Sequence, residues 1–256
     1  MARVTVVDIT SFADASAARI AELVEQSIAQ RGVAHVALTG GHTPELTYAA
    51  LADPARPHRD RIDWARVQLY WGDERHVPPD HPDSNFRMAE RTLVGRIPIP
   101  AANVHRIRAE LPHARDAAAQ YEHEVPEVFD VMLLGLGDDC HIASIFPESE
   151  LLSAWVARRE SEQGHASDSP APLMAKVAAV FAPHLDAWRI TLTPPALLRS
   201  AAILMLVTGA TKASAVAQAV DAPADMTRYP GQLLRDADDR VEWIIDTAAA
   251  NGLASY

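Results

Sequence analysis

The sequence holds a single cysteine, Cys140, among 256 residues. One thiol excludes an intramolecular disulfide and any zinc site built from several cysteines, so we expect a reducing compartment. The sequence also lacks any apolar run near the roughly 20 residues that a membrane-spanning helix needs. Residues 1–7 show neither the basic start nor the long apolar stretch of a secretory signal. These absences predict a cytoplasmic protein with no membrane partner.

Basic residues are scarce as well, because 23 Lys and Arg stand against 34 Asp and Glu, a formal net charge of −11. A nucleic acid partner needs a basic face for its phosphates, so this balance argues against one. A small anionic ligand stays compatible with the balance. A few Lys and Arg side chains in one cleft outweigh a distant, screened acidic field.

Apolar residues make up 48% of the chain and gather in short runs. Consecutive Val, Ile and Leu, rather than alternating ones, are typical of parallel strands covered on both faces. Such runs lie at 36–38, 67–71, 131–134, 190–192, 203–207 and 241–245. Between them, apolar residues recur at helical spacing, as in Ala17, Ile20, Ala21, Val24 and Ile28, and again in Ala213, Val216, Ala217 and Val220.

This alternation predicts an α/β fold with a doubly wound, mostly parallel, Rossmann-like sheet and helices on both faces. We expect one domain over residues 1–256, interrupted at 158–172 by a polar stretch rich in Ser, Gly and Pro. That stretch predicts a surface loop, interpreted as a solvated insertion, with a lid over a site as the alternative. In an open α/β sheet, ligands bind beyond the carboxyl ends of the strands.

Two early loops follow predicted strands at that edge. Residues 39–44 read Thr-Gly-Gly-His-Thr-Pro, where glycines permit close backbone approach and helix N-terminal amides favour phosphate; a tight turn without a ligand is the alternative. Residues 73–75 read Asp-Glu-Arg and place both charge signs at a strand end, although a structural ion-pair cluster is the simpler interpretation. Residues 82–85 predict a turn that leads into a helix cap.

The third loop is the most informative, because a buried strand leads through Gly135 and Gly137 to an acid, Asp139, and to His141. Histidine is the side chain best suited to move protons near neutral pH. A dinucleotide fingerprint is disfavoured, since Cys140 occupies the third glycine position and the motif lies mid-chain. Cys140 itself is a candidate nucleophile, but nothing besides His141 would activate it, and we interpret it as a packing residue.

Together these loops resemble the 6-phosphogluconolactonase family, in the group that also contains glucosamine-6-phosphate deaminases. The resemblance covers nearly the whole chain in matching order and spacing. It runs through residues 38–51, 67–93, 129–147, 189–201, 207–216 and 241–250.

The resemblance implies a Rossmann-like sheet without a nucleotide and hydrolysis of 6-phosphogluconolactone to 6-phosphogluconate in the pentose phosphate pathway. It places the catalytic histidine on His141 and the strand-end acid and arginine on Asp73 and Arg75. The implied phosphate contacts are Gly40, Gly41, Thr43, Arg189 and Lys212. No metal or other cofactor is implied, and the partner would be a phosphorylated sugar lactone bound to a monomer or small homo-oligomer.

The chain departs from the family pattern at three positions. Cys140 stands where glycine usually precedes the histidine, so the turn must avoid a positive φ or accept strain. His42 replaces a usual serine in the first loop. His184 is the nearest counterpart of a usual lysine, and its contact with phosphate would depend on pH.

As a mechanism, we expect His141 to act as general base on water, with Asp139 or Asp73 holding the imidazole or positioning the water. Arg75 would stabilise the developing oxyanion, while Arg189, Lys212 and the glycine loop would anchor the phosphate.

Two alternatives are an amino-sugar-phosphate deaminase or isomerase and a non-catalytic sugar-phosphate sensor. The deaminases carry an acid five positions after the histidine, where this chain has Phe146, and a sensor usually needs an output domain. A serine hydrolase is disfavoured by the lack of a Gly-x-Ser-x-Gly motif.

Overall fold

The computed structural model describes residues 3–162 and 175–254. The strands are β1 (Arg3–Val7), β2 (Ala34–Leu38), β3 (Val67–Trp71), β4 (Asp73–Arg75), β5 (Val131–Leu134), β6 (Val177–Ala182), β7 (Ala187–Leu192), β8 (Ala202–Val207) and β9 (Val241–Asp246). The α-helices are α1 (Ile9–Arg31), α2 (His42–Leu51), α3 (His58–Arg61), α4 (Asn85–Thr92), α5 (Ala114–Glu122), α6 (Glu150–Glu162), α7 (Pro194–Leu198), α8 (Ala213–Val220) and α9 (Thr247–Ala250). The 3-10 helices are η1 (Trp64–Arg66), η2 (Val94–Arg96), η3 (Ala101–Asn103), η4 (Pro183–Leu185), η5 (Ala210–Lys212) and η6 (Pro230–Arg240).

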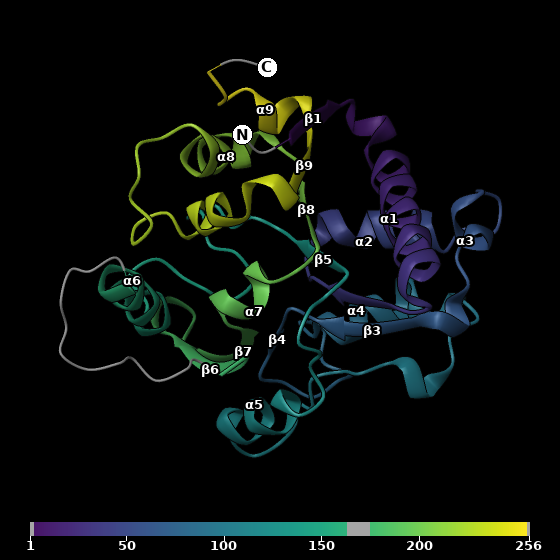
Figure 1. Cartoon of the computed structure of the whole chain (residues 1–256), viewed down its shortest axis with the longest axis horizontal. Coiled ribbons are helices and arrows are strands. Elements are labelled where there is room, and N and C mark those ends of the chain that lie inside the picture. Colours follow the sequence, from purple (N-terminus) through teal and green to yellow (C-terminus); the bar gives the residue numbers. More distant parts are fainter. Residues whose placement is uncertain (1–2, 163–174, 255–256) are drawn as a thin grey trace.

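Six strands form a wholly parallel sheet in the order β1-β9-β8-β5-β2-β3. Its central strand β5 is buried along its whole length, as its continuous apolar run predicts. Helices α1 and α2 cover one side of this sheet and α8 lies on the other (Figure 1). The predicted doubly wound fold with helices on both faces is confirmed, and β3 and β5 begin and end at the predicted residues.

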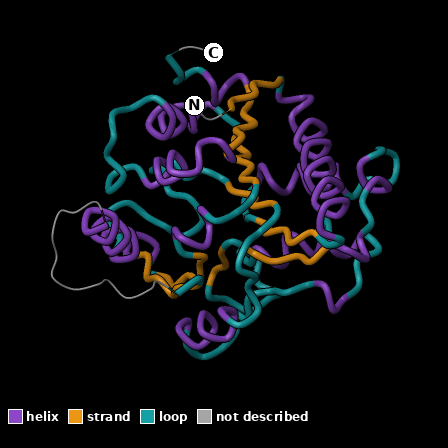
Figure 2. Tube along the Cα trace, in the orientation of Figure 1, coloured by secondary structure: helices purple, strands orange, loops and turns teal. Residues whose placement is uncertain are grey.

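One predicted strand belongs to a different sheet. Residues 190–192 end β7, which pairs antiparallel with both β6 and β4 in a separate three-stranded sheet (Figure 2). The reason is the short connection from β6, in which η4 and the left-handed Asp186 (φ 48°) reverse the chain. A connection this short cannot provide the crossover that parallel strands need. The expectation of a parallel strand at 190–192 was therefore wrong, and β1, β4 and β6 were not predicted.

The polar stretch predicted as a loop at 158–172 begins within a helix. Residues 158–162 form the last turns of α6, whose Leu152 and Trp155 pack on the core. Arg159 there pairs with Asp236 at 2.8 Å. The prediction was wrong for these residues, and its remainder, 163–172, lies outside the described residues. Within the described ranges, no helix is both long and apolar enough to cross a bilayer.

Two buried tyrosine hydroxyls fix the ends of neighbouring strands. Tyr121 on α5 accepts a hydrogen bond from Trp71 N at 2.8 Å and donates to Trp71 O at 3.1 Å, at the end of edge strand β3. Tyr48 on α2 does the same for Thr39, just after β2, at 2.9 Å to each atom. Burial raises the pKa of both phenols, so both stay protonated donors. These hydroxyls satisfy backbone groups that no further strand covers.

We expect Tyr121→Phe to lower the free energy of unfolding by about 1–3 kcal/mol, because two buried backbone groups of Trp71 lose their partner. Urea denaturation would measure the loss. Tyr229→Phe is the matched control, since the Tyr229 hydroxyl makes no hydrogen bond within the described part of the chain. Equal stability of Tyr121→Phe and the parent protein would contradict this role.

Candidate active site

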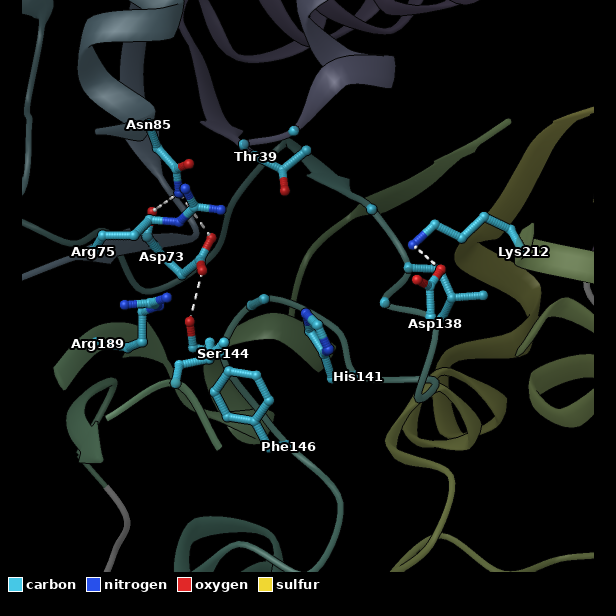
Figure 3. A pocket seen from close by; sticks show the side chains of 17 residues that line it. Thr39, Asp73, Arg75, Asn85, Asp138, His141, Ser144, Phe146, Arg189 and Lys212 are labelled. Atoms are coloured by element: carbon cyan, nitrogen blue, oxygen red, sulfur yellow. Dashed lines mark hydrogen bonds and ion pairs between the residues drawn. The ribbon is translucent and has the colours of Figure 1, made fainter. Parts of the chain in front are cut away.

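A cavity of about 340 Å³ opens where β2, β5 and β8 end, with β4 and β7 forming its far wall. Its size falls within the range of about 300–1,000 Å³ typical of small-molecule sites. The lining draws on all three predicted loops (Figure 3). It consists of Thr39, Gly40, Gly41, Asp73, Arg75, Asn85, Gly135, Leu136, Gly137, Asp138, His141, Ala143, Ser144, Phe146, Leu185, Arg189 and Lys212.

The first loop brings backbone to the cavity, and its two glycines are required by geometry. Gly41 has φ 107° and is the N-cap of α2, a conformation that favours glycine. A Cβ at Gly40 would overlap the side chain of Asn85. Backbone can therefore approach a ligand here at the N-terminus of a ten-residue helix.

Two other candidates from this loop lie outside the cavity lining. The His42 side chain is 80% exposed and faces Glu45 at 3.7 Å. Thr43 turns its hydroxyl toward that of Thr208 at 2.7 Å, which ties α2 to the end of β8. Thr43 thus connects the start of α2 to the residue that follows β8.

The second loop forms β4, and its three charged residues do not form the expected ion-pair cluster. Glu74 is buried and accepts hydrogen bonds from the backbone of Arg75, Asn85 and Phe86 at 2.7–2.8 Å. Burial raises its pKa against the effect of these bonds. Glu74 thus fixes the start of α4, which Ser84 caps within the stretch 82–85 where a turn leading into a helix cap was predicted. Asp73 and Arg75 face the cavity (Figure 3).

Two arginines lie opposite each other on the wall formed by β4 and β7. The antiparallel register pairs Arg75 with Arg189. Arg75 donates to Asp83 O at 2.7 Å and Arg189 to Trp188 O at 3.3 Å, both neutral carbonyls. Among the described residues, neither guanidinium has a carboxylate within ion-pair distance. Burial lowers the pKa of Arg189, and the charge of Arg75 lowers it further. Nearby carboxylates, Asp73 first, raise it again from beyond ion-pair distance. Two neighbouring guanidinium groups without a directly paired carboxylate present the donors that an anion needs.

The third loop presents His141 with a fixed orientation. Its Nδ1 lies 2.5 Å from Asp139 Oδ1, while Nε2 has no hydrogen-bond partner within residues 3–162 and 175–254. Burial alone would raise the pKa of Asp139, but the hydrogen bond and the charge of His141 outweigh it and lower the pKa to about 2. Gly137 makes room for this pair, since a Cβ there would overlap both side chains. The pair has the geometry of a general base and its orienting acid.

Cys140, which precedes His141 and replaces the usual glycine, adopts the strained backbone conformation that was one of the two expected outcomes. It has φ 68° and is fully buried. Its carbonyl accepts from Gly231 N at 2.8 Å, and its thiol lies 3.6 Å from Ala215 O. Burial raises the pKa of the thiol to about 11. These contacts agree with a packing residue and argue against a nucleophile.

The predicted phosphate cations do not share one side of the cavity. Lys212 lies across from Arg189 (Figure 3) and pairs with Asp138 at 2.7 Å. The assignment of the phosphate to Arg189 and Lys212 stays a prediction, although Arg189 lies beside Arg75 and across the cavity from Lys212. The cause of this arrangement is the β4–β7 pairing, which places Arg75 beside Arg189.

An aromatic cluster around Phe146 forms another side of the cavity. The Phe146 ring lies 4.8 Å from that of His141 and 5.0 Å from that of His184. His184 thus packs behind Phe146, and its neighbour Leu185 lines the cavity instead. Position 146, where the deaminases carry an acid, thus contributes an apolar ring to the cavity.

Sequence reasoning missed three polar residues of the lining: Asn85, Ser144 and Asp138. Asn85 carried a signal, because it belongs to the stretch 82–85 that was predicted to lead into a helix cap. Ser144 and Asp138 carried none beyond their place in the histidine loop. Among the described residues, no three His, Cys, Asp or Glu side chains lie together as metal ligands would.

Comparison with known sequences identifies relatives over nearly the whole chain. The profile of the family described as glucosamine-6-phosphate isomerases/6-phosphogluconolactonase matches residues 8–243. A 6-phosphogluconolactonase of Streptomyces coelicolor is 36% identical over 260 residues, covering 94% of this chain and 90% of the relative. Another, of Synechocystis, is 33% identical and covers 90% of this chain and 89% of the relative.

Solved structures agree with this relationship. The 6-phosphogluconolactonase of Trypanosoma brucei superposes with a TM-score of 0.77 at 27% identity, covering 99% of both chains. That of Thermotoga maritima gives a TM-score of 0.75 at 28% identity, covering 96% of this chain and 99% of the other.

The Asp139–His141 pair predicts a titration that NMR can follow. We expect the Asp139 carboxylate to titrate near pH 2, and His141→Ala to raise its pKa, because the side-chain hydrogen bond and the charge of His141 are lost while the opposing effect of burial remains. Since the folded-state pKa is depressed, the stability that the pair contributes is present above the ordinary pKa and is lost as the pH falls toward 2. An unchanged Asp139 titration in His141→Ala would contradict the pairing.

Proposed function

Because the chain belongs to the glucosamine-6-phosphate isomerase/6-phosphogluconolactonase family, we propose that it hydrolyses 6-phospho-D-glucono-1,5-lactone to 6-phosphogluconate in the pentose phosphate pathway. The observation that supports the proposal is one cavity lined both by His141, oriented by Asp139, and by the neighbouring guanidinium groups of Arg75 and Arg189, which we assign as general base and anion site. A lactone with a remote phosphate needs both.

The phosphate is assigned to the two facing arginines. Planar guanidinium groups bind phosphate oxygens in pairs, and here no carboxylate of the described residues lies within ion-pair distance of either one, although Asp73 acts on Arg189 from farther away. Lys212 is a weaker candidate, because Asp138 already compensates its charge. Lys212 and the amides of the glycine loop are assigned instead to the sugar end, where charge develops on the carbonyl oxygen.

His141 performs the proton transfers. Its Nε2 takes a proton from a water molecule while the water oxygen attacks the lactone carbon. The tetrahedral intermediate then collapses, the bond from that carbon to the ring oxygen breaks, and the imidazolium returns its proton to the departing oxygen. The carboxylic acid product ionises and releases one proton to solvent. Asp139 holds the imidazole tautomer throughout and stabilises the imidazolium.

The amino-sugar deaminase reaction is disfavoured by position 146. An acid there would serve to open a sugar ring, and the apolar Phe146 packs against His141 without a group that accepts or donates a proton. The lactone carbonyl is already electrophilic, so one water molecule and one general base are sufficient for its hydrolysis.

We expect His141→Ala to lower kcat about 10²- to 10⁴-fold and Asp139→Asn to lower it roughly 10- to 1,000-fold, because the base or its orientation is lost. The rate is measured on freshly generated 6-phosphogluconolactone against its spontaneous opening. His123→Ala, an exposed histidine outside the cavity lining, should behave as the parent protein. Full turnover by His141→Ala would remove His141 from the mechanism.

Comparing the phosphorylated lactone with the unphosphorylated one distinguishes the role of Arg189 from that of Lys212. Arg189→Ala should raise KM for the phosphorylated lactone about 10- to 100-fold and erase most of the preference for it, since a charged hydrogen-bond partner is lost. Lys212→Ala should lower kcat for both lactones and leave the preference in place.

The exposed Arg66→Ala, outside the lining, is the control for this comparison. Loss of the preference in Lys212→Ala but not in Arg189→Ala would reverse the assignment. Release of ammonia from glucosamine 6-phosphate by the parent protein would favour the deaminase alternative.

A further inference from the structure

The carboxylate of Asp73 is held by side chains from two other parts of the chain. Ser144 Oγ donates to Asp73 Oδ2 at 2.7 Å, and Asn85 Nδ2 lies 3.3 Å from Asp73 Oδ1 and 2.9 Å from Asp73 O. All three residues are buried, with Ser144 only 1% exposed. Each contact is drawn in one view of the cavity (Figure 3). A buried carboxylate held on both oxygens keeps a single orientation.

Ser144 belongs to the loop that carries His141. Its backbone N–H donates to Thr191 Oγ1 at 3.2 Å, and Thr191 is the register partner of Asp73 on β7. Ser144 is therefore attached twice to the β4–β7 wall, once through each end of the Asp73–Thr191 pair. Along the chain, Ser144 is 71 residues from Asp73 and 47 residues from Thr191.

The loop needs such attachments because its backbone is unfavourable. Cys140 (φ 68°) and Ala143 (φ 48°), on either side of His141 and Ile142, both adopt the left-handed region without being glycine. Each such residue raises the energy of the loop by about 1 kcal/mol or more. On one side, Gly231 holds the Cys140 carbonyl. On the other side, the bonds of Ser144 hold the loop.

We propose that Ser144 is a positioning residue for lactone hydrolysis, which fixes the His141 imidazole and the Asp73 carboxylate relative to each other across the cavity. It does so by one hydroxyl bond to Asp73 and one backbone bond to Thr191. Asp73 then presents a fixed acceptor to the water that His141 deprotonates. Ser144 takes no part in proton transfer, and it makes no contribution to phosphate binding at Arg75 and Arg189.

This inference rests on the proposed function, and the parent protein is assayed first on 6-phosphogluconolactone. A parent protein without lactonase activity defeats the proposed function, whereas an active parent protein leaves the role of Ser144 to be decided by its variants.

Ser144→Ala should lower kcat about 10- to 100-fold, as expected for loss of a hydrogen bond to a charged group, and change KM less than threefold. The matched control is Ser200→Ala. Ser200 is also fully buried, but its hydroxyl has no partner among the described residues, and it precedes β8 at the end of the sheet remote from the cavity. Its kcat and KM should equal those of the parent protein.

A double-mutant cycle separates positioning from simple destabilisation. If Ser144 acts through Asp73, the kcat losses of Ser144→Ala and Asp73→Asn should fall well short of multiplying in the double variant, while Ser200→Ala with Asp73→Asn should multiply. The NMR signal of the His141 ring should also move in Ser144→Ala and stay in place in Ser200→Ala.

Three results would overturn the proposal: unchanged kcat in Ser144→Ala, a change confined to KM, or fully multiplicative losses with Asp73→Asn. If Ser144→Ala does not fold, Thr191→Val replaces it in each measurement, because valine keeps the strand and removes the acceptor for Ser144 N, together with the local bond from the Thr191 hydroxyl to Leu192 O. It should lower kcat in the same sense with KM unchanged, and full activity of that variant would equally overturn the proposal.

Discussion

The antiparallel pairing of β4 with β7 is the constraint on which the cavity depends. Three register pairs set its far wall, and two of them face Asp73 with Thr191 and Arg75 with Arg189. The first pair holds the histidine loop through Ser144, and the second places two guanidinium groups side by side at the cavity. The main parallel sheet supplies the other wall from the ends of β2, β5 and β8. A shift of one residue in the β4–β7 register would turn these side chains to the opposite face.

Around this wall, the structure combines rigid parts with locally unfavourable ones. Buried tyrosine hydroxyls and the Glu74 carboxylate satisfy backbone groups where strands end, so the loops begin from fixed positions. The histidine loop then adopts two left-handed non-glycine conformations that would be unfavourable in isolation. Packing of Cys140 and the bonds of Ser144 compensate for them. Such local strain within a well-supported frame is typical of sites where orientation matters.

Much of this could be read from the sequence where the signal was local. Apolar runs at 67–71 and 131–134 gave the bounds of β3 and β5, and the order of strands and helices gave the fold. The second sheet was missed because β4 is three residues long and its partner lies more than 100 residues away. For the same reason the sequence could not place Arg75 beside Arg189, or Ser144 on Asp73. His141 and Asp139, which are two residues apart, were within reach of local reasoning.

The facing arginines also affect the energetics of the whole fold. In the free protein, the two like charges repel each other in a partly buried setting where water screens them incompletely. Under the proposed function, the phosphate dianion of the substrate relieves this repulsion, so its binding raises resistance to unfolding by mass action. Two neighbouring arginines thus couple binding of the proposed substrate to the stability of the whole fold.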